Sequence, residues 1–170
     1  MEEVLKSISI RGRFAFCLAC LQNAMLQKGI AVSELQLVLD RLNSFLSTTK
    51  LDEWEQYAVE VSPDTIFDEH PDNDFDDYET IGRDDLENLK DIYSRLPKSI
   101  VRLIDLIISV GISNLYGGTG EYSEHTLKPA TAVVKLMQEA GYKMPDVNLY
   151  KRFSFTENDG WGNAQSYLVA

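Results

Sequence analysis

The stretch KSIVRLIDLIISVGISNLY, residues 98–116, carries the strongest indication of the fold. Its apolar residues cover nearly the whole circumference of a helix, and only Arg102, Asp105 and Ser109 form a narrow polar stripe. A helix that is hydrophobic on nearly all sides is expected to be surrounded by other elements. The stretch therefore predicts a central helix, and the rest of the chain should supply the helices that cover it.

Five further segments show the three- and four-residue apolar spacing of amphipathic helices. They are residues 10–28, 33–46, 52–61, 83–96 and 129–140. Stop and start signals support them: Gly29 follows the first, Pro63 follows the third, and Ser33 with Gln36 matches a capping box. The pattern predicts an all-α bundle of about six helices, and 170 residues fit one domain, 1–170.

Two regions lack a helical period. Residues 62–81 contain two prolines and no sustained apolar spacing, which predicts a long acidic loop, and long loops in small domains often carry function. Near the C-terminus, LYKRFSFT (149–156) alternates in part and is rich in aromatic residues, which predicts a short strand or extended segment packed on the helices. The NDGWG sequence at 158–162 is typical of a tight turn.

The charge of the chain is concentrated in one block. The formal net charge is −11, and residues 64–91 alone contain twelve acidic and two basic residues. A strongly negative protein is repelled by nucleic acid and by anionic membranes, so neither is an expected partner. A basic protein partner is favoured instead.

The centre of that block is HPDNDFDDYET, residues 70–80. Asp72, Asp74 and Asp76 occupy the first, third and fifth places of an EF-hand calcium loop, but the sixth and twelfth places hold Asp77 and Arg83 instead of Gly and Glu. The calcium-loop interpretation therefore fails. The clustered carboxylates still suit weak binding of a hard cation. Two further hypotheses compete for the stretch: a solvated acidic loop, or a surface that recognises a cationic protein.

The aromatic residues between the acids favour recognition. Phe67, Phe75 and Tyr78 would supply anchors, while the carboxylates would supply steering and register. The same rings would also serve to tether a solvated loop to the core. The candidate partner-binding residues are Asp72, Asp74, Phe75, Asp76, Asp77, Tyr78 and Glu79.

No catalytic or cofactor motif stands out elsewhere. Cys17 and Cys20 share one face of an apolar helix and are predicted to be core thiols, and Gly117–Gly120 is predicted to be a turn between helices. Arg102 and Asp105 suggest a paired polar stripe at the core edge, with a buried catalytic pair as the alternative. His70 and His125 lie in no metal-ligand spacing, yet loop carboxylates with either histidine would suit a small metal-dependent hydrolase.

The N-terminal region resembles a short signal peptide because Arg11 and Arg13 precede the apolar FAFCLACL. Glu2 and Glu3 stand where a basic segment would be required, and no clear cleavage site follows. No apolar stretch reaches the roughly 20 residues that span a bilayer. A cytoplasmic protein with reduced thiols is expected.

The C-terminal FSFTENDGWG (153–162), together with the helical pattern and the acidic balance, resembles the helical immunity proteins encoded beside bacterial polymorphic toxins. The resemblance rests on Gly160, Trp161 and Gly162, on the helix order and on charge, and it transfers no binding residues. It implies a non-enzymatic cytoplasmic inhibitor, without a cofactor, that binds a cognate toxin domain. A nuclease toxin would present a basic groove to such an inhibitor. A general helical adaptor is a further alternative.

Overall fold

The computed structural model describes residues 1–68 and 78–165, and within these residues the chain is helical without a β-strand. The α-helices are α1 (Glu2–Lys6), α2 (Ile10–Lys28), α3 (Gln36–Ser44), α4 (Leu51–Val59), α5 (Pro63–Ile66), α6 (Arg83–Arg95), α7 (Lys98–Ile112) and α8 (Glu124–Glu139). The 3-10 helices are η1 (Val32–Leu35), η3 (Val147–Arg152) and η4 (Asn158–Gly160). The all-α prediction is confirmed, and each of the six predicted helices is present.

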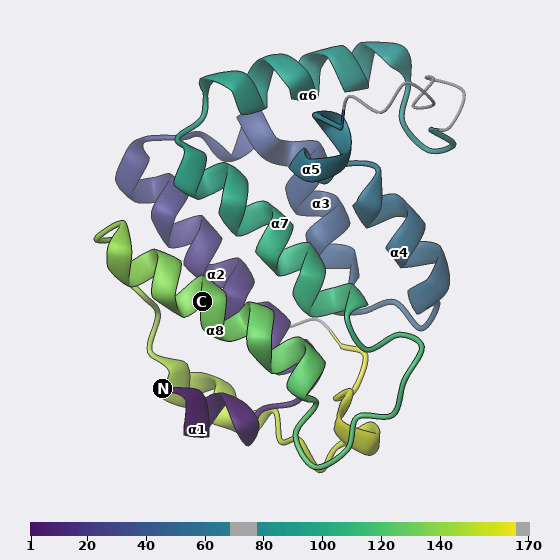
Figure 1. Cartoon of the computed structure of the whole chain (residues 1–170), viewed down its shortest axis with the longest axis vertical. Helices are drawn as coiled ribbons and strands as arrows, with labels where there is room; N and C mark the ends of the chain where they lie inside the picture. The colour runs from purple at the N-terminus through teal and green to yellow at the C-terminus, as the bar shows by residue number, and fades with distance from the viewer. Residues whose placement is uncertain (69–77, 166–170) are drawn as a thin grey trace.

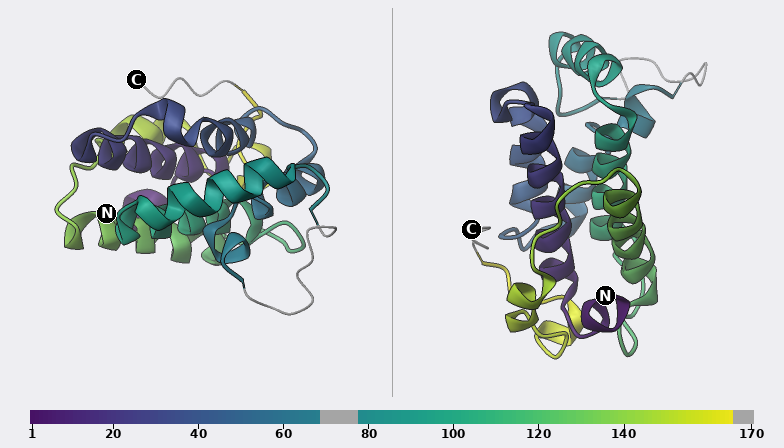
Figure 2. Two further views of the ribbon diagram at one scale, coloured as in Figure 1. Left: turned by 90° about the horizontal axis from the view of Figure 1, so that it is seen from above. Right: turned by 90° about the vertical axis from the view of Figure 1, so that its left-hand side faces the viewer.

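The helices form two layers with covers at both ends (Figures 1 and 2). The second view of Figure 2 shows α2 and α3 in one layer and α7 and α8 in the other. Helix α6 crosses one end of the two layers, whereas α1 and the C-terminal 3-10 helices lie at the opposite end. One hydrophobic core runs between the layers and includes residues from all the α-helices.

The predicted central position of residues 98–116 is confirmed for α7, which packs against α2, α4, α5 and α8. Helix α2 is surrounded even more completely, because every residue from Ile10 to Leu21 is buried. Small residues permit this close packing. A Cβ added at Gly111 of α7 would lie 2.4 Å from the Trp54 ring of α4.

Two arginines of α2, Arg11 and Arg13, are buried inside this core. They do not flank an apolar segment as the basic residues of a signal peptide would. The side chain of Arg13 is fully buried and donates hydrogen bonds to four backbone carbonyls and one hydroxyl. Its acceptors are Leu5 O, Lys6 O, Tyr122 O, Ser123 O and Thr126 Oγ1. Arg11 donates to the carbonyls of Phe45 and Thr48. The two residues that resembled a signal-peptide flank therefore join α1 and α8, and the turn after α3, to α2.

Several predicted boundaries were wrong at the residue level. The Ser33–Gln36 capping box does not form; η1 begins the segment, and Glu34 Oε1 accepts from the Ala31 amide at 3.0 Å. Helix α8 starts at Glu124 and contains Pro129, because packing of its buried face outweighs the proline break.

Of the two alternatives predicted for residues 149–156, a short strand or an extended segment, the strand does not form. Residues 147–152 form the 3-10 helix η3, and within the described chain the only β-type pairing is an isolated antiparallel bridge between Ile8 and Ser154. The turn predicted at 158–162 is η4, in which Asn158 and Asp159 both have positive φ. Tyr150 and Phe153 are buried, so the aromatic residues pack on the bundle as expected.

The long loop predicted over 62–81 is shorter than expected at its start. Pro63 does not simply end the preceding helix; it is the first residue of α5, a position that tolerates its missing N–H. Residues 69–77 lie outside the described part of the chain. The extent of the predicted loop between α5 and α6 therefore stays a prediction.

Candidate protein-interaction site

The predicted partner-binding residues divide into two groups. Tyr78 and Glu79 are described by the structure, whereas Asp72, Asp74, Phe75, Asp76 and Asp77 lie outside the described residues. The structure describes the two flanks of the acidic block. The first flank is α5 with the residues up to 68, and the second flank is residues 78–82, which lead into α6.

Glu60, the residue that follows α4, holds the second flank. Its carboxylate is buried and accepts from the Glu79 amide at 2.7 Å and from the Thr80 amide at 3.0 Å. The Thr80 hydroxyl donates to the same carboxylate. A buried carboxylate requires several donors to offset its lost hydration, and here the donors are the backbone and side chain of the segment after the acidic run.

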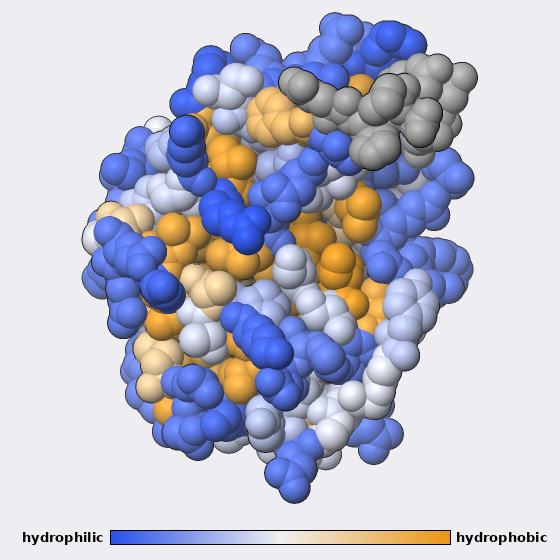
Figure 3. All heavy atoms as spheres, in the orientation of Figure 1, coloured by the Kyte–Doolittle hydropathy of each residue, from blue (hydrophilic) through white to orange (hydrophobic). Residues whose placement is uncertain are grey.

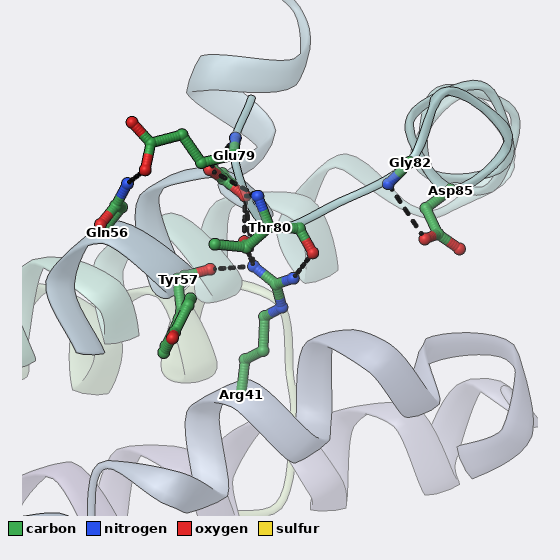
Figure 4. A network of polar contacts seen from close by, with 8 residues as sticks. Arg41, Gln56, Tyr57, Glu79, Thr80, Gly82 and Asp85 are labelled. Atoms are coloured by element: carbon green, nitrogen blue, oxygen red, sulfur yellow. Dashed lines mark hydrogen bonds and ion pairs between the residues drawn. The ribbon is translucent and has the colours of Figure 1, made fainter. Parts of the chain in front are cut away.

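Arg41 of α3 completes this network (Figure 4). Its guanidinium donates to Tyr57 O at 2.5 Å, to Thr80 Oγ1 at 2.8 Å and to Thr80 O at 3.0 Å. It also lies 3.7 Å from the Glu60 carboxylate, with both side chains largely buried. Residues 79 and 80 are thus bound to two helices at once.

The neighbouring contacts extend the fixed segment in both directions. The exposed Glu79 side chain accepts from Gln56 Nε2 of α4 at 2.6 Å. At the start of α6, the Gly82 amide donates to Asp85 Oδ2 at 3.3 Å. We call Arg41, Gln56, Glu60, Glu79 and Thr80 the latch, because they attach the end of the acidic block to α3 and α4.

Tyr78 is half-buried and directs its hydroxyl to Thr65 O of α5, at 3.4 Å. It contributes to a pocket of about 400 Å³ whose lining comes from α4, α5 and the latch. Its contact favours the tethering hypothesis for this ring. Phe67, by contrast, is 45% exposed and lies beside Tyr93, with ring centroids 6.3 Å apart.

Acidic side chains are exposed on the helices around the latch. They are Asp52 and Glu53 on α4, Asp64 on α5, and Asp84, Asp85, Glu87 and Asp91 on α6. Some of these are paired locally, for example Glu53 with Lys50 and Asp91 with Arg95. The surface keeps its negative balance because residues 64–91 contain twelve acidic side chains and only two basic ones.

The first flank depends on Asp105 of α7. This buried carboxylate accepts through Oδ1 from Ser62 Oγ at 2.9 Å and from the Asp64 amide at 3.1 Å. Arg102 pairs with Asp64 at 3.6 Å, so the predicted Arg102–Asp105 pair is replaced by contacts from both residues to the start of α5. Burial raises the pKa of Asp105 to about 6.

The other residues singled out from the sequence form no reactive centre with one another. Cys17 and Cys20 are buried in α2 as predicted, and burial raises the pKa of the Cys20 thiol to about 12. Gly117–Gly120 connects α7 to α8, which confirms the predicted turn. His125 is exposed in the first turn of α8, and His70 lies outside the described residues.

Residues 1–68 and 78–165 contain no group of three or more His, Cys, Asp or Glu side chains that could hold a metal ion. Within the same ranges, no helix has both the length and the apolar character that crossing a membrane requires.

Sequence reasoning missed Arg41, Glu60 and Thr80 as parts of the site. Glu60 belongs to a predicted helix and carries no pattern that marks it. Its partners are mainly backbone N–H groups, which every residue except proline possesses, so no pairing of residue types could have indicated the contact.

Comparison with protein-family models, with curated proteins and with solved structures finds no match to this chain.

Proposed function

We propose that this chain is a non-enzymatic protein that binds and neutralises a basic partner protein through the acidic surface of residues 64–91. In this proposal it acts as an immunity protein of a bacterial polymorphic toxin system, in the cytoplasm and without a cofactor. The partner is a cognate toxin domain of the nuclease type. The observation that carries the proposal is the charge block of twelve acidic and two basic residues within a chain of net charge −11.

Electrostatics supports a basic protein as the partner. A nuclease binds phosphates with basic side chains, so an acidic protein can occupy the same surface in place of nucleic acid. Opposite charges also steer the two proteins together and accelerate association. Nucleic acid and anionic membranes are disfavoured as partners because their negative charge repels an acidic protein.

The two anchored flanks add support. Asp105 holds the start of α5, and the latch holds residues 79 and 80. The exposed carboxylates of Asp64, Glu79 and Asp84 therefore occupy defined positions on the bundle. A preorganised surface loses less conformational entropy on binding than a mobile one.

The test measures association of the chain with the toxin-like domain encoded next to it. Replacing Asp74, Asp76 and Asp77 together with Asn removes three charges from the block. We expect the association rate constant at low salt to fall about tenfold and its salt dependence to flatten, because steering depends on these charges. Stopped-flow fluorescence over a series of NaCl concentrations measures both quantities.

A matched control removes the same charge elsewhere. Glu121, Glu124 and Glu139 are exposed residues before and within α8, and their joint replacement with Gln should change the rate constant much less. If the two triple variants lower the association rate constant equally, the acidic block has no specific role in binding the partner. If co-expression of the chain rescues cells from no adjacent toxin-like protein, the immunity function itself is wrong.

A further inference from the structure

A second pocket lies on the face shown in Figure 3, between α5, the end of α6 and the start of α7. Its volume is about 460 Å³. Figure 3 shows hydrophobic atoms gathered along α7 on this face, with hydrophilic atoms around them. We call this cavity the Asp105 pocket, and define it by Phe67, Tyr93, Leu96, Val101, Arg102 and Asp105.

The Asp105 carboxylate lines this pocket, and only one of its two oxygens accepts hydrogen bonds from the protein. The residue is only 6% exposed, and both hydrogen bonds to its side chain, from Ser62 and from the Asp64 amide, end on Oδ1. Among the described residues, no hydrogen bond reaches Oδ2. Oδ2 is not one of the buried unpartnered atoms, so it faces the solvent of the pocket, where an ammonium donor can replace water in a charge-assisted hydrogen bond.

The charged neighbours of Asp105 leave that oxygen to a ligand. Arg102 is directed to Asp64 at the mouth of the pocket, where both side chains are more than half exposed. Lys98 is exposed at the rim, and the Tyr93 hydroxyl donates to Val61 O at 2.6 Å. The charged groups of Arg102, Asp64 and Lys98 therefore lie at the edge of the pocket. The Tyr93 hydroxyl already donates its hydrogen bond to a backbone carbonyl.

The walls of the pocket are apolar. Leu96 and Val101 are half-buried, and Phe67 remains 45% exposed beside Tyr93. A ligand with an aliphatic stem would cover this apolar surface, at a gain of roughly 25 cal/mol per Å². Aromatic faces also attract a cation that passes close to them.

We propose that the Asp105 pocket binds an alkylammonium group, which donates to Asp105 Oδ2 while its methylene stem packs on Leu96, Val101 and Phe67. This chemistry is that of a lysine side chain in a protein or of a free aliphatic amine. The inference does not depend on the proposed immunity function, because it concerns a pocket outside the latch and requires no toxin.

The test uses the full chain and n-butylammonium chloride as the probe. The carboxyl carbon resonance of Asp105 is followed by NMR as a function of pH, with and without the probe. An ammonium beside the carboxylate favours the charged form, so we expect the pKa of Asp105 to fall by about one unit at saturation. Affinity should also weaken as the pH falls and Asp105 becomes protonated.

Two control compounds separate charge from stem. Ammonium chloride supplies the charge without the stem, and 1-butanol supplies the stem without the charge. Each should produce a much smaller shift than n-butylammonium at the same concentration and ionic strength. An equal shift with ammonium chloride would overturn the proposal, because it would reveal general screening.

Two variants test the location. Asp105→Asn removes the carboxylate charge, and Val101→Phe narrows the pocket while the carboxylate remains. We expect each to weaken n-butylammonium binding at least tenfold, an effect typical of losing a charge-assisted contact or its packing. Wild-type affinity in a folded Val101→Phe variant would overturn the proposal even if Asp105→Asn did not fold.

A final comparison distinguishes the two sources of the ammonium. The peptide acetyl-Gly-Lys-Gly-amide is titrated beside n-butylammonium, with acetyl-Gly-Gln-Gly-amide as its control. Tighter binding of the lysine peptide assigns the pocket to a protein side chain, and tighter binding of n-butylammonium assigns it to a small amine. Absence of binding by both compounds would overturn the proposal.

Discussion

Arg13 connects three segments of the chain at one end of the bundle. Its guanidinium joins α2 to the carbonyls at the end of α1 and to the turn before α8. Burial lowers its pKa to about 10, so it stays charged at neutral pH. Backbone carbonyls, and not a carboxylate, provide the compensating partial charges.

Replacing Arg13 with Met should therefore destabilise the protein by about 3 to 5 kcal/mol, because several buried acceptors lose their donor. Urea unfolding followed by circular dichroism measures this change. Lys135→Met on the exposed surface of α8 is the matched control and should change the free energy of unfolding by less than about 0.5 kcal/mol. A loss below 1 kcal/mol for Arg13→Met would contradict the structural role given to the buried guanidinium.

Asp105 should make stability depend on pH. Its pKa in the folded state is about 6, above the ordinary value of 3.8. The folded protein therefore binds this proton more tightly than the unfolded chain does, and the stability contributed by the protonated carboxyl is lost as pH rises from about 4 to about 6. Because the pocket admits solvent, which screens the charge, we expect a loss of about 1 kcal/mol.

The measurement compares urea unfolding of the wild type and of Asp105→Asn at several pH values across that interval. The wild type should lose more stability than the variant as pH rises, since the other titrating groups are common to both. Parallel pH profiles would show that Asp105 does not titrate in this range.

At the scale of elements, the latch determines how the acidic block joins α3 and α4. Glu60→Gln replaces a carboxylate oxygen with an NH₂ group that would face the donors of Glu79, Thr80 and Arg41. We expect a loss of about 2 to 3 kcal/mol, together with faster hydrogen exchange of the Glu79 and Thr80 amides.

Glu53→Gln is the control for this prediction, because Glu53 lies on the same helix and forms an exposed pair with Lys50. It should change stability by about 0.5 kcal/mol or less. If both variants exchange at wild-type rates at residues 79 and 80, the latch does not hold that segment.

The packing of α7 on α4 provides a second prediction for elements. A methyl group at Gly111 would lie 2.4 Å from the Trp54 ring and 3.2 Å from the Phe14 ring, so one of the helices must move. Gly111→Ala should cost about 2 to 3 kcal/mol despite the better helix propensity of alanine.

Gly117→Ala serves as the matched substitution, since a Cβ there meets no heavy atom within 4 Å. We expect an effect of less than about 0.5 kcal/mol at this surface position. Thermal unfolding monitored by calorimetry compares the two variants. Equal stability of both variants would mean that α7 and α4 are not in close contact at Gly111.

For the whole molecule, the net charge of −11 implies self-repulsion within the folded state. Raising NaCl from about 20 to about 300 mM shortens the screening length and should raise the free energy of unfolding by about 1 kcal/mol. Replacing Asp74, Asp76 and Asp77 with Asn should reduce this salt effect. Chemical unfolding in urea at each salt concentration measures it, and a fall in stability with added salt would contradict the prediction.

The sequence alone predicted most of the helices, because apolar spacing along one segment reflects a face that must be buried somewhere. It did not predict that α8 begins before Pro129 or that residues 147–152 form a 3-10 helix. In both places packing against distant residues outweighs local preference. For the candidate site, it located the acidic block but indicated neither the Glu60 and Arg41 contacts nor the donors of Asp105.

The amino-acid sequence by itself determined the helical class, the main helices and the concentration of negative charge in residues 64–91, since these are properties of neighbouring residues. Only the tertiary structure decided which group each of these charged side chains pairs with. Arg13 binds carbonyls, Glu60 binds amides and Arg102 turns to Asp64 instead of Asp105. Backbone donors and acceptors are common to almost every position, so the partners of these charges are determined only when the chain folds.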